Sequence, residues 1–482
     1  MAVRLFVPHP VGMANNGDAQ RLFCQINADA GSAPRATAKW MFVRLVYPVA
    51  YHLPNCPSYP TTQLIQVGLT SWIHRHVLGM SGALDIRELI VEYCLLVGLV
   101  MAAAAWLLNS ARPPTRIAVL VALFLVLSEA TFADYAGSPY SEVAAHLGLL
   151  VLAVAGVAAV CAGRYSRAAF LVAWAAAVYA VGAKNETVTL AIPLGLLLGS
   201  RRFEAGRLRG RFGARLVPAL CVLSLAATAG WSLASESRDD QHVNFANEMT
   251  MTIMPMSGNP GQVAVDLGLP RSFGRYSGSN WWSPQTVVHD PLFHHYQSRF
   301  TQPVLVRYLA EHPVMAARIA SGGATSYLDF RNPVLGTYPI DSGYAQESQE
   351  CRDCLLMDVS HAMRWAGFPG ILLYWTACAA GAIWLLRTSR PTTRRRGFAL
   401  VTLTLLACTL LQYATAVYGE GNEVTKHLSV ALLAASLAPV WIAAGATQER
   451  SRPTPEPDIP QPRPALAARL LAGRAAGQGE SA

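Results

Sequence analysis

Long apolar runs separated by short polar segments recur along most of the chain. A helix of about 20 apolar residues crosses the ~30 Å hydrocarbon core of a bilayer. Nine runs approach or reach that length: Leu89–Leu108, Ile117–Phe132, Val143–Ala162, Ala168–Ala183, Val188–Leu198, Leu216–Leu233, Phe368–Leu386, Phe398–Val417 and Leu428–Ala444. The pattern predicts an all-α polytopic membrane protein with nine spans. The fifth run is short, which is typical of a tilted or re-entrant segment.

The composition agrees with this prediction. Of the 482 residues, 52% are hydrophobic and only 14% are charged, whereas a typical soluble domain carries about 25% charged residues. The sequence contains no Walker loop, no Gly-x-Gly-x-x-Gly after a strand, no His-Glu-x-x-His and no Gly-x-Ser-x-Gly. These motifs belong to nucleotide-driven transport, dinucleotide binding and soluble-type hydrolase chemistry, so we do not expect those functions.

Arginine placement orients the predicted helices. Arginines gather in alternate short connections, at Arg112 and Arg116, Arg164 and Arg167, 201–215, and 387–396. Because Lys and Arg are enriched in cytoplasmic loops, these connections are assigned to the cytoplasm and the others to the outside of the plasma membrane. The net charge of +9 follows from this distribution. No compact basic domain remains that would indicate nucleic-acid binding.

The spans divide the chain into five parts: a first extracytoplasmic segment at 1–86, a six-helix region at 87–234, an extracytoplasmic domain at 235–367, a three-helix region at 368–445, and a tail at 446–482. The Pro/Arg-rich tail is typical of a disordered cytoplasmic segment. Within the extracytoplasmic domain, apolar positions from Gln302 to Ala320 follow a helical period, which predicts a small, mainly helical domain.

The orientation places residue 1 outside although no apolar run precedes it. We therefore expect a further helix upstream of Met1, which would bring the total to ten. The alternative is an N-terminal arm exported together with the first pair of helices.

Four cysteines, Cys24, Cys56, Cys351 and Cys354, fall in the predicted outer segments. An even number of cysteines in an oxidising compartment favours disulfides. Cys351 and Cys354 either pair with each other or with the two N-terminal cysteines, and both arrangements stay open.

A short polar run, Asn15-Asn16-Gly17-Asp18, is the first candidate for chemistry. Asn-Gly favours a tight turn, which presents the next side chain to solvent or to a cleft. On spacing alone, an ordinary surface turn is the simpler interpretation.

The connection from Asp134 to Glu142 is the second candidate. It carries two carboxylates, two tyrosines and two serines within nine residues, at the outer end of two predicted helices. Glu142 also opens the following helix, where the helix dipole favours a carboxylate. Helix capping and a functional role are therefore both open.

Lysine is rare, and its positions are the third candidate. It occurs only at Lys39, Lys184 and Lys426, the last two at outer helix ends. Outer lysines run against the positive-inside trend and suit a phosphate group, which a lysine binds as a point charge. The alternative is contact with lipid headgroups by snorkelling.

Aromatic and histidine residues in the 235–367 domain are a weaker signal. Trp281 and Trp282 fit either an interfacial belt or a platform for sugar rings. The histidines at 289, 294 and 295 match no strong metal-binding spacing, so no metal ligand is assigned.

Together these motifs resemble the GT-C superfamily of membrane glycosyltransferases, and more narrowly the WsfD-type hexose transferases of bacterial surface-glycan biosynthesis. The run from Pro10 to Asp18 is similar to their Pro-x-Gly-x-x-x-Asn-Gly-Asp pattern. The run from Asp134 to Glu142 is similar to their second outer loop, with Gly137 where Asn is usual. The resemblance spans nearly the whole chain and implies a GT-C-like bundle.

The resemblance implies an inverting transfer of a sugar, expected to be a hexose, from a polyprenyl-phosphate donor to a cell-surface glycan or lipid-linked acceptor on the outer membrane face. It makes Asp18 the catalytic base. The substrate-binding residues it implies are Asn16, Asp134, Tyr140, Ser141, Glu142, Lys184, Lys426 and His427. The cofactor stays open, with a divalent cation as one candidate.

Two other functions fit the same pattern. A transporter or flippase of lipid-linked sugars is one, although the spans are nearly free of ionisable groups away from their outer ends, where transporters place them throughout. A glycan polymerase or ligase, which transfers a preassembled chain, is the other.

Overall fold

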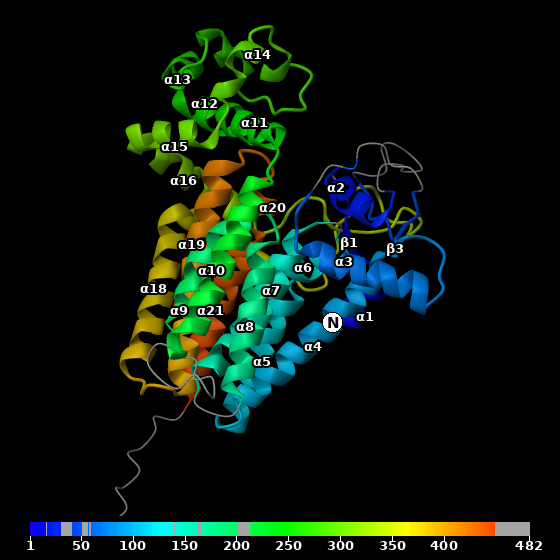
Figure 1. Ribbon diagram of the computed structural model, residues 1–482, viewed down its shortest axis with the longest axis vertical. Coiled ribbons are helices and arrows are strands. Elements are labelled where there is room, and N and C mark those ends of the chain that lie inside the picture. The colour runs from blue at the N-terminus through cyan, green and yellow to red at the C-terminus, as the bar shows by residue number, and fades with distance from the viewer. Residues whose placement is uncertain are drawn as a thin grey trace, which may run out of the picture. The chain divides into compact units, whose positions relative to one another are not determined.

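The computed structural model describes residues 1–15, 17–29, 41–50, 56, 59–138, 140–161, 165–200 and 213–448. Met1–Gln448 form one compact unit. In the described residues this unit is mainly helical, with two short two-stranded sheets (Figure 1). The expected all-α membrane fold is therefore confirmed. The expected tail lies almost wholly outside the described residues, in 449–482.

Each of the nine predicted apolar runs overlaps a helix for most of its length, but not all nine of these helices are long enough to span a membrane. These helices are α4 (Ile86–Leu107), α5 (Pro113–Ser128), α7 (Glu142–Val160), α8 (Ser166–Val181), α9 (Ala191–Gly199), α10 (Gly213–Ala234), α18 (Gly367–Arg387), α19 (Arg394–Gly419) and α21 (Ser429–Thr447). Within the described chain, six helices are long and apolar enough to cross a membrane, namely α4, α7, α10, α18, α19 and α21. Helices α8 and α9 are shorter, since the chain between them forms the 3-10 helix η5 (Asn185–Leu190).

The predicted second span is bent. Helix α5 and the following α6 (Ala130–Ala133) meet at an angle of 55°. Glu129 takes an extended backbone conformation at the break. Its carboxylate accepts the amide N–H of Leu356 at 2.8 Å, and the carbonyl of Asp353 accepts the N–H of Ala130 at 2.8 Å. The bend is therefore held by a loop more than two hundred residues away in sequence.

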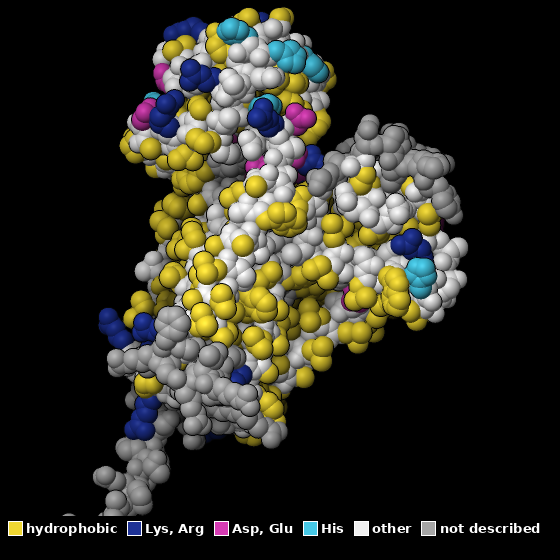
Figure 2. All heavy atoms as spheres, viewed as in Figure 1, with side chains coloured by type: hydrophobic (Ala, Val, Ile, Leu, Met, Phe, Trp, Pro, Cys, Tyr) yellow, Lys and Arg dark blue, Asp and Glu magenta, His cyan; other side chains and the backbone are white. Residues whose placement is uncertain are grey.

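Helix α7 lies at the centre of the bundle and is buried on nearly all sides, against α4, α8, α19 and α21. Gly148 allows close packing, because a Cβ at this position would lie 2.6 Å from the Ala176 carbonyl oxygen of α8. Helices α4 and α18 instead expose apolar side chains such as Leu99 and Leu373. Figure 2 shows hydrophobic side chains over the bundle, as expected for helices that face lipid.

The two ends of the bundle differ in charge. Arg394, at the start of α19, donates to the Leu107 carbonyl oxygen at 3.0 Å, so α4 ends where α19 begins. We call this the arginine end. Helix α19 has 26 residues, which carry the chain about 39 Å to the opposite end of the bundle. We call this the pocket end, because a polar cavity lies there. The positive-inside rule assigns the arginine end to the cytoplasm, and this sidedness stays an expectation from the sequence.

Residues 235–366 form a mainly helical cap. Its residues 238–329 lie beyond the pocket end of α19, whereas 330–354 run beside the N-terminal segment (Figure 1). Its main elements are α11 (Arg238–Asn247), the π-helical turn η6 (Glu248–Ile253), α12 (Met254–Ser257), α13 (Pro260–Asp266), α14 (Phe293–Tyr296), α15 (Gln302–Glu311), α16 (Pro313–Asp329) and α17 (Leu355–Ala362). Buried phenylalanines, including Phe245, Phe293 and Phe300, form its core.

The helical pattern expected from Gln302 to Ala320 is present, but it is divided between two helices. The structure breaks it at His312, between α15 and α16. Pro313 has no backbone N–H and disfavours the helical conformation of the residue before it. His312 accordingly takes φ −123° and ψ 66°.

The N-terminal segment contains α1 (Ala2–Phe6), β1 (Gly12–Met13), α2 (Ala19–Phe23), β2 (Val46–Tyr47), α3 (Gln63–Trp72) and β3 (Leu84–Asp85). Strand β1 pairs antiparallel with β4 (Leu335–Thr337) of the cap, and β2 pairs with β3. The disulfides are Cys24–Cys56 and Cys351–Cys354, which decides between the two predicted arrangements. The β1–β4 pairing joins this segment to residues 335–337, whereas each disulfide closes a loop within its own segment.

Candidate functional site

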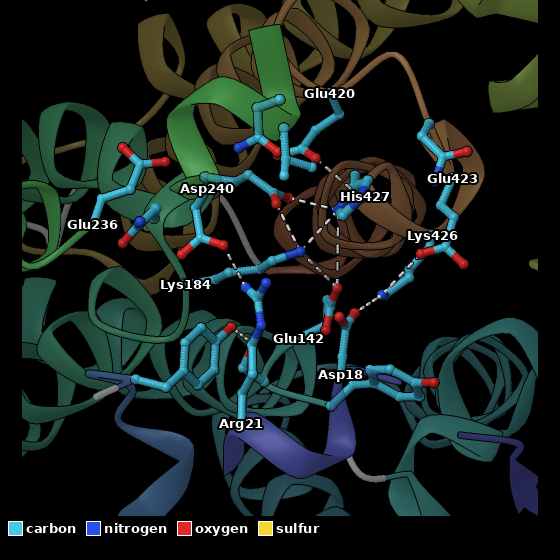
Figure 3. Close-up of a pocket in the computed structure, with 18 of the residues that line it drawn as sticks. Asp18, Arg21, Glu142, Lys184, Glu236, Asp240, Glu420, Glu423, Lys426 and His427 are labelled. Atoms are coloured by element: carbon cyan, nitrogen blue, oxygen red, sulfur yellow. Dashed lines mark hydrogen bonds and ion pairs between the residues drawn. The ribbon is translucent and has the colours of Figure 1, made fainter. Parts of the chain in front are cut away.

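An open polar cavity of about 130 Å³ lies at the pocket end, between α2, the start of α7, η5, α11 and the short helix α20 (Val424–His427) (Figure 3). Among the described residues that line it, three carry a permanent positive charge: Arg21, Lys184 and Lys426. Seven are carboxylates: Asp18, Glu142, Glu186, Glu236, Asp240, Glu420 and Glu423. The cavity therefore carries an excess of negative charge.

Asp18 is placed by the turn that the sequence predicted. The buried Asn15 side-chain oxygen accepts the backbone N–H groups of Gly17 at 2.8 Å and Ala19 at 3.2 Å. Gly17 has φ +110°, a conformation that glycine adopts readily. The chain then enters α2 at once, and the Asp18 carboxylate projects into the cavity.

The turn is held against the second loop by two glycines and a tyrosine. A Cβ on Gly12 would lie 2.1 Å from the Gly137 carbonyl oxygen, so only glycine permits this approach. The Tyr140 hydroxyl donates to the Ala14 carbonyl oxygen at 2.8 Å. These contacts bring Asp18 next to the loop that ends in Glu142.

Lys426 faces Asp18 from the opposite wall. Its Nζ lies 2.5 Å from Asp18 Oδ2, 3.2 Å from Glu423 Oε2 and 4.5 Å from the centre of the Tyr140 ring. Removal from water disfavours the Asp18 carboxylate, but Lys426 and Lys184 outweigh this effect and hold the pKa of Asp18 below its ordinary range. Burial likewise opposes the Lys426 charge, yet Asp18 and Glu142 raise its pKa well above the ordinary range.

A second cluster surrounds Lys184. Its Nζ lies 2.7 Å from Glu186 Oε1, 3.3 Å from Glu142 Oε1 and 3.0 Å from His427 Nδ1. His427 lies between two carboxylates, with Nδ1 2.8 Å from Glu186 Oε2 and Nε2 3.4 Å from Glu420 Oε2. Among the described residues, Glu186, Glu420 and His427 form a grouping of metal-ligand type, with ligand atoms within 4.8 Å of one another.

Ser141 has a structural partner in the cavity wall. Its hydroxyl lies 2.9 Å from the hydroxyl of Tyr59, and burial raises the pKa of Tyr59 to about 12. Arg21 bridges to Asp240 of α11 at 2.8 Å and so joins the N-terminal segment to the cap.

The structure brings together most of the predicted site residues, but it separates Asp134 from them. Asp18, Tyr140, Ser141, Glu142, Lys184, Lys426 and His427 all line the cavity. Asn16 lies outside the described residues.

Asp134 is fully buried outside the cavity, 2.9 Å from Arg4 and 2.8 Å from Arg331. Glu350 pairs with the same Arg4. Asp134 therefore belongs to a buried ion-pair cluster.

Several cavity residues were not singled out from the sequence. The two short polar hairpins that contain Lys184 and Lys426 also contain Glu186, Glu420 and Glu423. Their closeness in sequence to these lysines could have identified them as candidate site residues. Arg21 and Tyr59 carried no such signal, since only the folded N-terminal segment places them in the wall.

Comparison with known proteins gives one match. A family model described as the YfdI N-terminal transmembrane domain matches residues 1–452. No curated protein matches the chain, and no solved structure matches it.

Proposed function

The chain belongs to the YfdI N-terminal transmembrane domain family, and from that premise we propose that it is an inverting membrane glycosyltransferase. It moves a sugar, taken to be a hexose, from a polyprenyl-phosphate donor to a cell-surface glycan or lipid-linked acceptor. The cavity at the pocket end is the active site, and it faces the outside of the membrane.

One observation carries the proposal. The Asp18 carboxylate and two ammonium groups, Lys426 and Lys184, converge in one open cavity at the end of an apolar bundle. Transfer from a lipid phosphate needs both kinds of group. A carboxylate takes the proton of the acceptor hydroxyl, and positive charge stabilises the phosphate that leaves. The lipid tail of such a donor requires a site at the membrane surface.

The reaction proceeds by one displacement. Asp18 accepts the proton of the acceptor hydroxyl as that oxygen forms a bond to the anomeric carbon. The bond from the anomeric carbon to the phosphate oxygen breaks on the opposite face, and its electron pair stays on the phosphate. The configuration at the anomeric carbon is therefore inverted. Lys426 and Lys184 stabilise the additional negative charge of the phosphate.

The Asp18–Lys426 pair suggests how the base is released. With Lys426 at 2.5 Å, Asp18 is a weak base. A donor phosphate competes for the same ammonium, because charge-assisted contacts to phosphate are strong. When Lys426 turns to the phosphate, Asp18 loses its nearest counter-charge and becomes more basic. Donor binding thus prepares the base for the acceptor.

The decisive experiment is Asp18→Asn, assayed in membranes with a radiolabelled polyprenyl-phosphate hexose. We expect sugar transfer to fall by 10²–10⁴-fold, the usual contribution of a general base, while expression persists. Asp266→Asn is the matched control, since Asp266 lies on α13 of the cap and outside the cavity. Full activity of Asp18→Asn contradicts the assignment.

The product formed in this assay distinguishes the proposed function from the two alternatives. A single added sugar supports the proposal, and a transferred chain indicates a polymerase or ligase. Movement of the donor across the bilayer without incorporation indicates a flippase.

A further inference from the structure

We propose that the cavity binds one divalent metal cation through Glu186, Glu420 and His427, beside the position given to the donor phosphate. The inference deepens the proposed function, but metal binding itself requires neither donor nor acceptor. It is therefore testable on the protein alone.

The three side chains converge from separate elements. Glu186 lies in η5, Glu420 follows the last residue of α19, and His427 ends α20. Figure 3 shows Glu420 and His427 directed toward each other inside the cavity. Their ligand atoms, with one from Glu186, lie within 4.8 Å of one another. A cation with bonds of about 2.0–2.2 Å to oxygen and nitrogen fits donors at such separations.

The arrangement leaves one face of Glu186 for a cation. Lys184 Nζ contacts Glu186 Oε1 at 2.7 Å, whereas Oε2 faces His427 Nδ1 at 2.8 Å. The second imidazole nitrogen faces Glu420 Oε2 at 3.4 Å. His427 thus has a carboxylate oxygen beside each ring nitrogen, and Lys184 Nζ lies 3.0 Å from the Nδ1 that faces Glu186. Two carboxylates and one imidazole are a common ligand set for a divalent ion.

The charge of the cavity favours a cation independently of this geometry. Among the described lining residues, seven carboxylates face three permanent positive charges. An incoming phosphate adds further negative charge, which such a cavity repels. A divalent cation offsets this excess of carboxylates.

The ligand set indicates the class of metal. Carboxylate oxygens suit Mg²⁺, Ca²⁺ and Mn²⁺, whereas imidazole nitrogen suits first-row transition metals. Mn²⁺ accepts both kinds of ligand, and its free form gives a strong electron paramagnetic resonance signal. It is therefore the probe.

The test is a Mn²⁺ titration of the full chain purified in detergent, without donor or acceptor, followed by electron paramagnetic resonance. We expect one saturable site. Glu420→Gln and Glu186→Gln are each expected to weaken Mn²⁺ binding by more than tenfold. Glu236→Gln is the control, because it removes the same charge from a cavity carboxylate outside the ligand set. Its affinity is expected to stay within twofold of wild type.

Pulsed measurement on the unmutated protein gives a second readout that does not depend on the folding of variants. A bound imidazole produces a nitrogen coupling to Mn²⁺, and we expect to observe it. Absence of a saturable site, absence of the nitrogen coupling, or equal weakening by Glu420→Gln and Glu236→Gln overturns the inference. If binding fails while Asp18→Asn still abolishes transfer, only the metal inference falls. If binding holds while Asp18→Asn retains activity, only the proposed function falls.

Discussion

Asp18 Oδ2 lies 2.5 Å from Lys426 Nζ, although 408 residues separate the two in sequence. The contact joins the first turn after β1 to the short helix before the last span. It also sets the protonation behaviour of the proposed base, since Lys426 is the nearest counter-charge of Asp18. Of the four predictions that follow, one concerns this pair directly and one concerns the cavity in which it lies.

Lys426→Gln is expected to shift the acidic limb of the pH–activity profile upward. In the wild type, Lys426 holds the pKa of Asp18 below its ordinary range, so the carboxylate stays ionised in mildly acidic solution. Without the ammonium, the charge of Lys426 no longer lowers this pKa, so the pKa rises and activity is lost at a higher pH. We also expect kcat to fall by roughly 10²–10³, because a charge on the leaving phosphate is no longer stabilised. Transfer rates between pH 4 and 8 check this, and an unchanged acidic limb contradicts it.

Asp134→Asn is expected to reduce stability rather than chemistry. Asp134 is fully buried between Arg4 and Arg331 and does not line the cavity. Removing one partner of a buried ion pair typically costs about 3–5 kcal/mol, because it leaves uncompensated charge. Thermal unfolding in detergent measures the loss, and the folded fraction should keep its specific activity. A stable but inactive Asp134→Asn protein would contradict the prediction and indicate that Asp134 takes part in catalysis.

Trp282→Ala is expected to weaken acceptor binding. Trp282 lines the cavity from the cap, and 64% of its surface is exposed. Aromatic faces next to a few polar groups are typical of ligand pockets. We expect KM for the acceptor to rise about tenfold, or ~1.4 kcal/mol, with KM for the donor unchanged. Trp365→Ala is the control, since Trp365 is 86% exposed but lies outside the cavity. Equal effects of the two variants contradict the prediction.

Glu248→Gln is expected to stabilise the protein at alkaline pH. Glu248 is fully buried in η6, and burial raises the pKa of its carboxyl to about 8. Between its ordinary pKa and pH 8, the folded state binds more protons than the unfolded state, so stability falls as pH rises. Glutamine removes this dependence. Melting temperatures at pH 5 and pH 9 should show the larger gain of the variant at pH 9, and equal gains contradict the assignment.

Apolar periodicity located the helices because the information is local. All nine runs overlap helices, and the placement of arginines predicted which loops share one end of the bundle. Breaks within the helices were harder to predict from the sequence. Pro313 divides the helical pattern between α15 and α16. The second span bends at Glu129, whose neighbourhood is held by hydrogen bonds to Asp353 and Leu356.

The site was predictable where a polar residue stood at a helix end. Lys184, Glu142 and Lys426 share a face because their helices end at the same level, and the structure joins them in one cavity. Asp134 looked equivalent in sequence. Its partners Arg4 and Arg331 come from remote segments, so its separation from the cavity depends on tertiary packing alone.

The order of the chain has a consequence for biogenesis. The N-terminal segment, the start of α7 and η5 supply Asp18, Glu142 and Glu186 early, whereas Lys426 and His427 come just before the last span. A nascent chain that has inserted every span up to α19 holds the carboxylates without two of their partners. The cavity is completed only when α20 and α21 reach the membrane, so an incompletely synthesised chain holds no assembled site.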